Sequence, residues 1–102
     1  VVEEVNEGDE IAKALGDKKV AILQNHGILT TGPSVDIALW FYMSMERCCQ
    51  AQLMAESAGS PISVPHETAI KTREFIANDI AAWASYQPAF DKIIKMQPEL
   101  LD

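Results

Sequence analysis

The sequence is poor in positive charge and in long apolar runs, and each deficit argues against one class of partner or location. Eight Lys and Arg residues stand against 15 Asp and Glu residues, which gives a formal net charge of −7. A nucleic acid or an anionic membrane surface is approached through a basic face, and no basic cluster is found in the sequence. The longest apolar run covers residues 37–43, whereas a membrane-spanning helix needs roughly 20 residues. We therefore expect neither a nucleic-acid partner nor a membrane span.

Cysteine is also scarce. Cys48 and Cys49 are adjacent in a predicted helix, where consecutive side chains point about 100° apart, so a disulfide between them is unfavourable. Two thiols that pack as small apolar side chains are the simpler interpretation. This usage fits a reducing, cytoplasmic setting. The sequence opens on Val1 without a charged and then apolar leader, so we expect it to begin inside a longer protein.

The most informative stretch covers residues 20–32. Two short apolar runs flank Asn25, His26 and Gly27, a pattern that predicts a strand, a tight polar connection and a second strand. Four consecutive apolar residues at 20–23 suit a strand that is covered on both faces. At least one residue of the connection is expected to take a positive φ angle. His26 can offer a ring nitrogen to a metal, although a single histidine in a turn is more often a structural hydrogen-bonding residue.

A long helix is predicted over residues 34–58. Ser34 is the expected N-cap after Gly32 and Pro33, and residues 57–61 contain the stop signals. Because residues 37–43 are apolar on every side, this part of the helix must be covered on more than one side. In its second half an inward-facing set is predicted, namely Met45, Cys48, Cys49, Ala51, Leu53, Met54 and Ala55. Since 102 residues offer too little cover, parts of the domain or partner subunits are expected to be missing.

Shorter elements flank this centre. Residues 1–7 are expected to be an extended lead-in, and Asp9 to cap a brief helix that Gly16 ends. Two prolines make residues 61–65 an extended linker. Helices are predicted over residues 66–102, the first running from Glu67 to about residue 85, with Pro88 as the interruption before a final turn or two.

Residues 20–59 resemble the C-terminal part of the class II aldolase and adducin family. The resemblance rests on three segments in one register: Gln24-Asn25-His26-Gly27-Ile28-Leu29-Thr30-Thr31-Gly32, Ser34-Val35-Asp36-Ile37-Ala38 and Glu46-Arg47-Cys48-Cys49-Gln50-Ala51-Gln52-Leu53. Because several independent features agree on one register, the resemblance is specific for this family. It implies an α/β fold in which residues 1–102 form a single partial domain, the C-terminal part of a three-layer α/β/α domain with a mostly antiparallel sheet. Assembly into a homotetramer is implied as well.

The resemblance also implies an activity for the full-length parent. In the family's sugar-phosphate aldolases and epimerases three histidines bind zinc, and the histidine of the Asn-His-Gly motif is one of them, a metal role that carries over to His26. The parent is then a zinc-dependent carbon–carbon lyase that cleaves or epimerises a small sugar phosphate. The remaining ligands, the catalytic acid and the phosphate-binding loops would lie upstream. Because a catalytic zinc needs three protein ligands and His66 is interpreted as a helix-start residue, no catalytic residue is assigned here, and the chain alone is expected to be inactive and to bind zinc weakly.

Two alternatives remain open at this point. Ala51-Gln52-Leu53 and the run to Gly59 are at least as similar to adducin heads as to bacterial aldolases. This similarity favours a non-catalytic, adducin-like module for oligomerisation and interaction, in which His26 only makes hydrogen bonds in its turn. The other alternative is an α/β domain whose likeness to the family is merely architectural. Whether the parent is an enzyme is therefore uncertain from the sequence.

Overall fold

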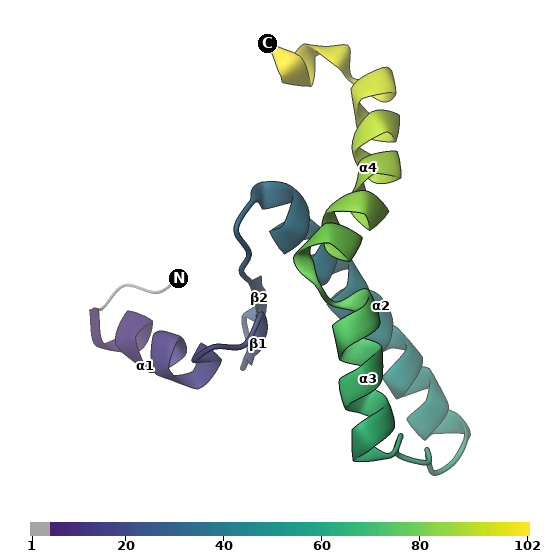
Figure 1. Ribbon diagram of the computed structural model, residues 1–102. Helices are drawn as coiled ribbons and strands as arrows, with labels where there is room; N and C mark the ends of the chain where they lie inside the picture. The colour runs from purple at the N-terminus through teal and green to yellow at the C-terminus, as the bar shows by residue number, and fades with distance from the viewer. Residues whose placement is uncertain (1–4) are drawn as a thin grey trace.

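The computed structural model describes residues 5–102. The elements follow in the order α1 (Val5–Leu15), β1 (Val20–Leu23), β2 (Gly27–Thr30), α2 (Val35–Ala58), α3 (His66–Ile76), α4 (Asp79–Met96) and the 3-10 helix η1 (Pro98–Leu101). The two strands lie between α1 on one side and α2 on the other, and the end of α4 stands clear of the body together with η1 (Figure 1). This part of the chain is thus an α/β arrangement with helices on both sides of a small antiparallel sheet.

The first helix is longer than the sequence predicts. It includes residues 5–7, which we expected to be extended, and Asp9 lies inside it rather than at its N-cap. The acidic Glu7 in the first turn favours this longer helix, because negative charge is stabilised near a helix N-terminus. Gly16 ends the helix as predicted, with a φ angle of 55° and its N–H donated to the carbonyl oxygen of Ala12 at 2.9 Å. The expectation for residues 1–4 lies outside the described residues.

The strands form an antiparallel hairpin with Val20 opposite Thr30 and Leu23 opposite Gly27. Because directly opposed residues share a face, one face carries Val20, Ile22 and Ile28, while Ala21 and Leu29 lie on the other. Apolar residues on both faces are typical of a strand that is covered twice. The cover is incomplete within residues 5–102, however, since Ile22 is 63% exposed. The prediction of full cover is therefore wrong for this chain by itself.

The core lies where α2 meets α4 and the hairpin. Within residues 5–102 the buried side chains are Ile37 and Phe41 of α2 and Ala82 of α4, with Val20 packed against them. Ser34 caps α2 as predicted, its Oγ accepting the N–H of Ile37 at 3.3 Å. Thr30 donates its Oγ1–H to the carbonyl oxygen of Ala38 at 2.9 Å, which fixes β2 to the first turns of α2.

The second half of α2 is exposed rather than inward-facing. Cys48 is exposed, Leu53 is 67% exposed and Met54 is exposed too, whereas Cys49 is partly buried. Of the predicted inward set, Met45 and Cys49 are partly buried and the other five residues are exposed. The prediction is wrong for those five, because α4 and the hairpin pack near the buried residues of the first half. Residues 50–58, which form the end of α2, are all exposed.

The break between the C-terminal helices is not at Pro88. It falls between α3 and α4, where Asn78 caps both: its Oδ1 accepts the N–H of Ala81 at 2.9 Å, and its Nδ2 donates to carbonyl oxygens at the end of α3. Pro88 lies inside α4. The preceding Gln87 donates from Nε2 to the carbonyl oxygen of Trp83 at 3.1 Å and to Oδ2 of Asp36 at 2.9 Å. This link to the first turn of α2 holds α4 in place at the point where the proline removes a backbone donor.

Candidate functional site

His26 lies at the tip of the hairpin and is exposed. The carbonyl oxygen of Leu23 accepts the N–H of His26 at 3.0 Å, which closes a tight turn over Gln24 and Asn25. Asn25 has a φ angle of 62°, a left-handed conformation that Asn tolerates better than most residues. The predicted positive φ angle is thus found in the connection. Gly27, which we assigned to the connection, is instead the first residue of β2.

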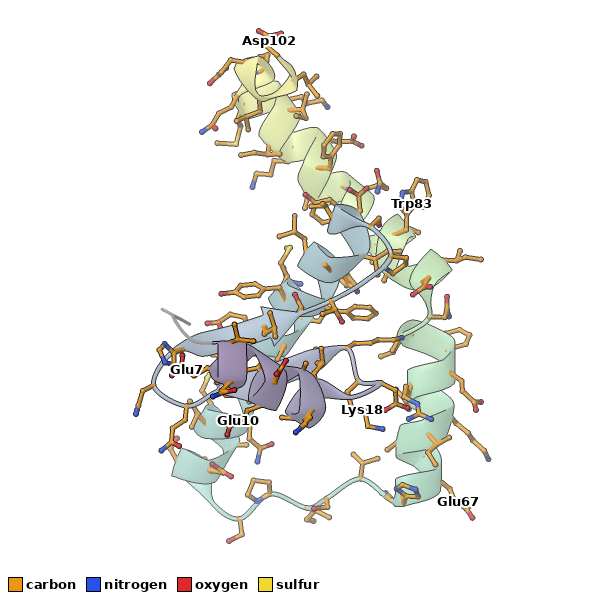
Figure 2. All side chains as sticks on the ribbon, turned by 90° about the vertical axis from the view of Figure 1, so that its left-hand side faces the viewer. Glu7, Glu10, Lys18, Glu67, Trp83 and Asp102 are labelled. Carbon is orange, nitrogen blue, oxygen red and sulfur yellow. The ribbon has the colours of Figure 1, made fainter. Side chains whose placement is uncertain are left out.

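A hollow of about 470 Å³ opens beside His26, between the hairpin and α1. Its apolar part comes from both elements, and Glu7 and Glu10 of α1 add carboxylates. Figure 2 looks onto this side of the molecule, with the labelled Glu7 and Glu10 on the helix in front of the hairpin. The lining residues are Glu7, Glu10, Ile11, Ala14, Ala21, Ile22, Leu23, Gln24 and His26. One imidazole therefore lies at the edge of a partly apolar, negatively charged hollow.

These residues do not fit a complete zinc site. No group of three or more His, Cys, Asp and Glu side chains that could hold a metal occurs within residues 5–102, whereas catalytic zinc takes three protein ligands. His66 is the first residue of α3, so the second histidine belongs to another element, at the helix start where the sequence places it. The metal role of His26 therefore stays a prediction that needs ligands from beyond this part of the chain.

Lys19 is a contact residue that the sequence analysis missed. Its Nζ donates to the carbonyl oxygen of Ala77 at the end of α3, and the same ammonium lies 4.8 Å from the ring centroid of Phe41. A cation over an aromatic face and at a helix C-terminus is favourable on both counts. Lys19 thereby joins the start of β1 to the core and to the α3–α4 junction. A lysine in a polar turn gives no sequence signal for such a role.

A second hollow of about 790 Å³ lies around this junction. Lys18, Lys19 and Arg73 line it, but Asp17 and Glu74 do so as well. Because Lys19 is already engaged, two cationic side chains face two carboxylates in this lining, and the hollow shows no preference for an anion or a cation. It carries no functional assignment.

Helices on both sides of an antiparallel hairpin, with a histidine at the hairpin tip, are the arrangement that the family resemblance implies. The family model for the Class II Aldolase and Adducin N-terminal domain matches residues 2–53. The chain belongs to the class II aldolase and adducin family.

Three relatives illustrate the range of the family. Decarboxylase NovR of Streptomyces niveus is 36% identical over 95 residues, which are 93% of this chain and 35% of that protein. Adducin-related protein 1 of Caenorhabditis elegans is 36% identical over 64 residues, 62% of this chain and 9% of that protein. The solved structure of L-fuculose 1-phosphate aldolase from Glaciozyma antarctica PI12 superposes with a TM-score of 0.86 at 35% identity, covering 97% of this chain and 39% of that one.

Two facts follow for this chain. The fold is that of part of a class II aldolase, an α/β fold, since nearly the whole chain superposes on the aldolase. The chain spans about a third of the length of NovR, so the activity of the whole protein is a matter for proposal. Within residues 5–102, no helix combines the length and the apolar character that crossing a membrane requires.

Proposed function

We propose that this chain is the C-terminal part of a zinc-dependent class II aldolase-type enzyme, to which it contributes His26 as one metal ligand. The observation that carries the proposal is the position of His26, exposed at a tight hairpin tip and on the edge of a hollow. A turn held by a backbone hydrogen bond and a left-handed asparagine fixes the backbone from which the imidazole projects. A residue that binds a metal together with residues from other parts of the fold must be held in one position by its backbone.

The proposed reaction is aldol cleavage or epimerisation of a small sugar phosphate by the full-length protein. The likeness to L-fuculose 1-phosphate aldolase supports this choice. The likeness to Decarboxylase NovR supports the broader class, carbon–carbon lyase. Aldol cleavage and decarboxylation both break a carbon–carbon bond and leave an electron pair that a neighbouring carbonyl group can take up. A metal ion at such a carbonyl acts as a Lewis acid.

The chain by itself is proposed to be inactive. Residues 1–102 correspond to a minor part of the aldolase and of NovR, and no catalytic residue is assigned within them. The two further zinc ligands would come from the part of the domain that is not included in this sequence. A homotetrameric assembly in the cytoplasm, which the resemblance implies, belongs to the same proposal.

A second candidate function is a non-catalytic, adducin-like module for oligomerisation and interaction. The similarity to Adducin-related protein 1 favours it. In this alternative the turn at His26 is retained for its shape, and the protein carries no zinc.

Zinc analysis of the full-length protein distinguishes the two. An intact-mass measurement first establishes the length of the purified protein, and the zinc content is then measured by inductively coupled plasma mass spectrometry. The enzyme proposal expects about one zinc per chain in wild type and in His66→Ala, and little in His26→Ala. Equal zinc contents in the two variants would contradict the role of His26. A full-length wild-type protein without zinc would favour the adducin-like module.

A further inference from the structure

The segment that joins α2 to α3, residues 59–65, contains neither helix nor strand, and all of its residues are exposed. We call it the α2–α3 linker, and it lies at the lower end of the two helices in Figure 1. Its first residue has φ 168° and ψ −153° and its last has φ −54° and ψ 141°, so both ends are extended. Within residues 5–102, no N–H group of residues 60–64 makes a backbone hydrogen bond. The linker is therefore free to bind in the peptide groove of another protein.

The linker carries two hydroxyl groups, on Ser60 and Ser63, and neither makes a hydrogen bond within residues 5–102. The nearest bonded hydroxyls in the flanking helices differ from them. Ser57 donates its Oγ–H to the carbonyl oxygen of Met54 at 2.7 Å, and Thr72 donates in the same way within α3. The two linker hydroxyls combine an extended backbone, exposure and a free oxygen, so they are open to chemical modification.

The residue that follows distinguishes the two serines. Pro61 follows Ser60, whereas Val64 follows Ser63. A residue before proline is restricted to extended backbone angles, so Ser60 loses less conformational freedom when it binds in an extended groove. Because Pro61 has no N–H group, an enzyme that accepts it needs an apolar surface at this position instead of a hydrogen-bond acceptor. Ser60 is therefore the better substrate for an enzyme that recognises serine followed by proline.

We propose that Ser60 is a phosphorylation site, modified by a protein kinase that selects serine followed by proline. The Ser60 Oγ attacks the γ-phosphorus of a nucleoside triphosphate, and an oxygen–phosphorus bond forms. The bond from that phosphorus to the bridging oxygen breaks, the nucleoside diphosphate leaves, and the hydroxyl proton passes to the catalytic carboxylate of the kinase. This inference goes beyond the proposed function and is independent of it, since it involves neither His26 nor a metal.

The phosphate would act on the end of α2. Ser60 lies two residues beyond Ala58, the last residue of the helix, and the last turn contains Glu56 and no basic residue. A phosphoserine carries a charge of roughly −1.5 to −2 at neutral pH, and negative charge at a helix C-terminus is unfavourable. Phosphorylation therefore loosens the last turn, which is closed by the hydrogen bond from the Gly59 N–H to the carbonyl oxygen of Ala55 at 3.1 Å.

Mass spectrometry of the full-length protein tests the proposal. The protein is incubated with ATP and a purified kinase that selects serine followed by proline, and phosphoryl groups are located by peptide mapping. We expect one phosphoryl group on Ser60 in wild type and in Ser63→Ala, and at least tenfold less in this linker in Ser60→Ala and Pro61→Ala. Ser63→Ala is the matched control, because it makes the same chemical change in the same exposed segment. Protein purified from its native cells should carry the phosphate at the same position.

Hydrogen exchange measures the effect on the helix. Amide groups of residues 55–59 should exchange at least threefold faster in the phosphorylated protein than in the unmodified protein, and those around the buried Phe41 should not change. Full-length protein that takes up no phosphate on Ser60 would overturn the proposal, as would native protein without phosphate there. Equal uptake in Ser60→Ala and Ser63→Ala would show that the linker is not the modified segment. Unchanged exchange at the end of α2 would remove the proposed effect of the phosphate on the helix.

Discussion

Replacement of Phe41 by alanine tests whether the small core holds the chain together. The Phe41 ring is 8% exposed, packs with Ile37 and Ala82, and receives the ammonium of Lys19 on its face. Removal of a buried phenylalanine side chain costs about 3–5 kcal/mol. The free energy of unfolding of a small domain is about 5–15 kcal/mol in total. A chain with three buried residues is expected near the lower end of this range. Phe41→Ala should therefore remove most of the free energy of unfolding.

Urea unfolding followed by far-UV circular dichroism measures this loss. The matched control is Phe75→Ala, because Phe75 lies near the end of α3 and is 81% exposed. The two variants make the same chemical change and differ in the burial of the ring. We expect Phe75→Ala to change the free energy of unfolding by less than about 0.5 kcal/mol, as is usual for surface substitutions.

Equal losses in the two variants would refute the reasoning. They would mean that Phe75 is covered in solution, and the exposure of the α3 surface could not be argued from the single chain. Unchanged stability in Phe41→Ala would mean that the contact between α2 and α4 is not the core.

Three further substitutions probe local features by thermal unfolding. Asn25→Ala should cost about 1–2 kcal/mol because alanine is strained at a φ angle of 62°, whereas Asn25→Gly should not; equal effects would show that the turn can rearrange. Asn78→Ala should cost about 0.5–2 kcal/mol through loss of the α4 N-cap, and Asn78→Ser should retain most of the stability. Pro88→Ala should raise stability by restoring a backbone donor inside α4, and a decrease would show that the proline ring itself makes a stabilising contact.

The hairpin and the long helix could be predicted because their signals are local. Apolar runs on either side of the Asn25 turn define the strands, Ser34 supplies the cap at the start of α2, and Gly59 follows its last residue. Each feature depends on neighbours in the sequence, and each is found at or within a residue of its predicted position. The same holds for Gly16 at the end of α1.

The predictions are wrong where a helix end or the burial of a side chain depends on residues far away in the sequence. Pro88 is an ordinary helix breaker, yet α4 continues through it, and the preceding Gln87 is bound to Asp36, a contact that spans 51 residues. The break falls at Asn78, whose capping bonds compete with a continuous helix. Burial of Cys48 and Leu53 was predicted from the pattern of the helix, but burial also requires something to pack against it. That cover is absent from the described residues.

In the candidate site, too, some residues could be predicted from local sequence and others could not. His26 could be selected from the sequence because the Asn-His-Gly motif and the hairpin pattern are local. The neighbouring Glu7 and Glu10 could not, since their place in the hollow depends on the full extent of α1 and on its packing against β1. The role of Lys19 depends likewise on its contact with Ala77, 58 residues away.

The segment that the family model matches, residues 2–53, does not contain everything that holds it together. Its buried Ile37 and Phe41 pack against Ala82, and Asp36 is bound by Gln87, so α4 completes the core from outside the matched segment. A chain shortened to residues 1–59 should therefore lose cooperative unfolding and the slow hydrogen exchange of α2. A chain shortened to residues 1–97, which removes η1, should keep both, because none of the buried core residues lies in η1. Cooperative unfolding of the 1–59 chain would show that the hairpin and α2 hold together without α4.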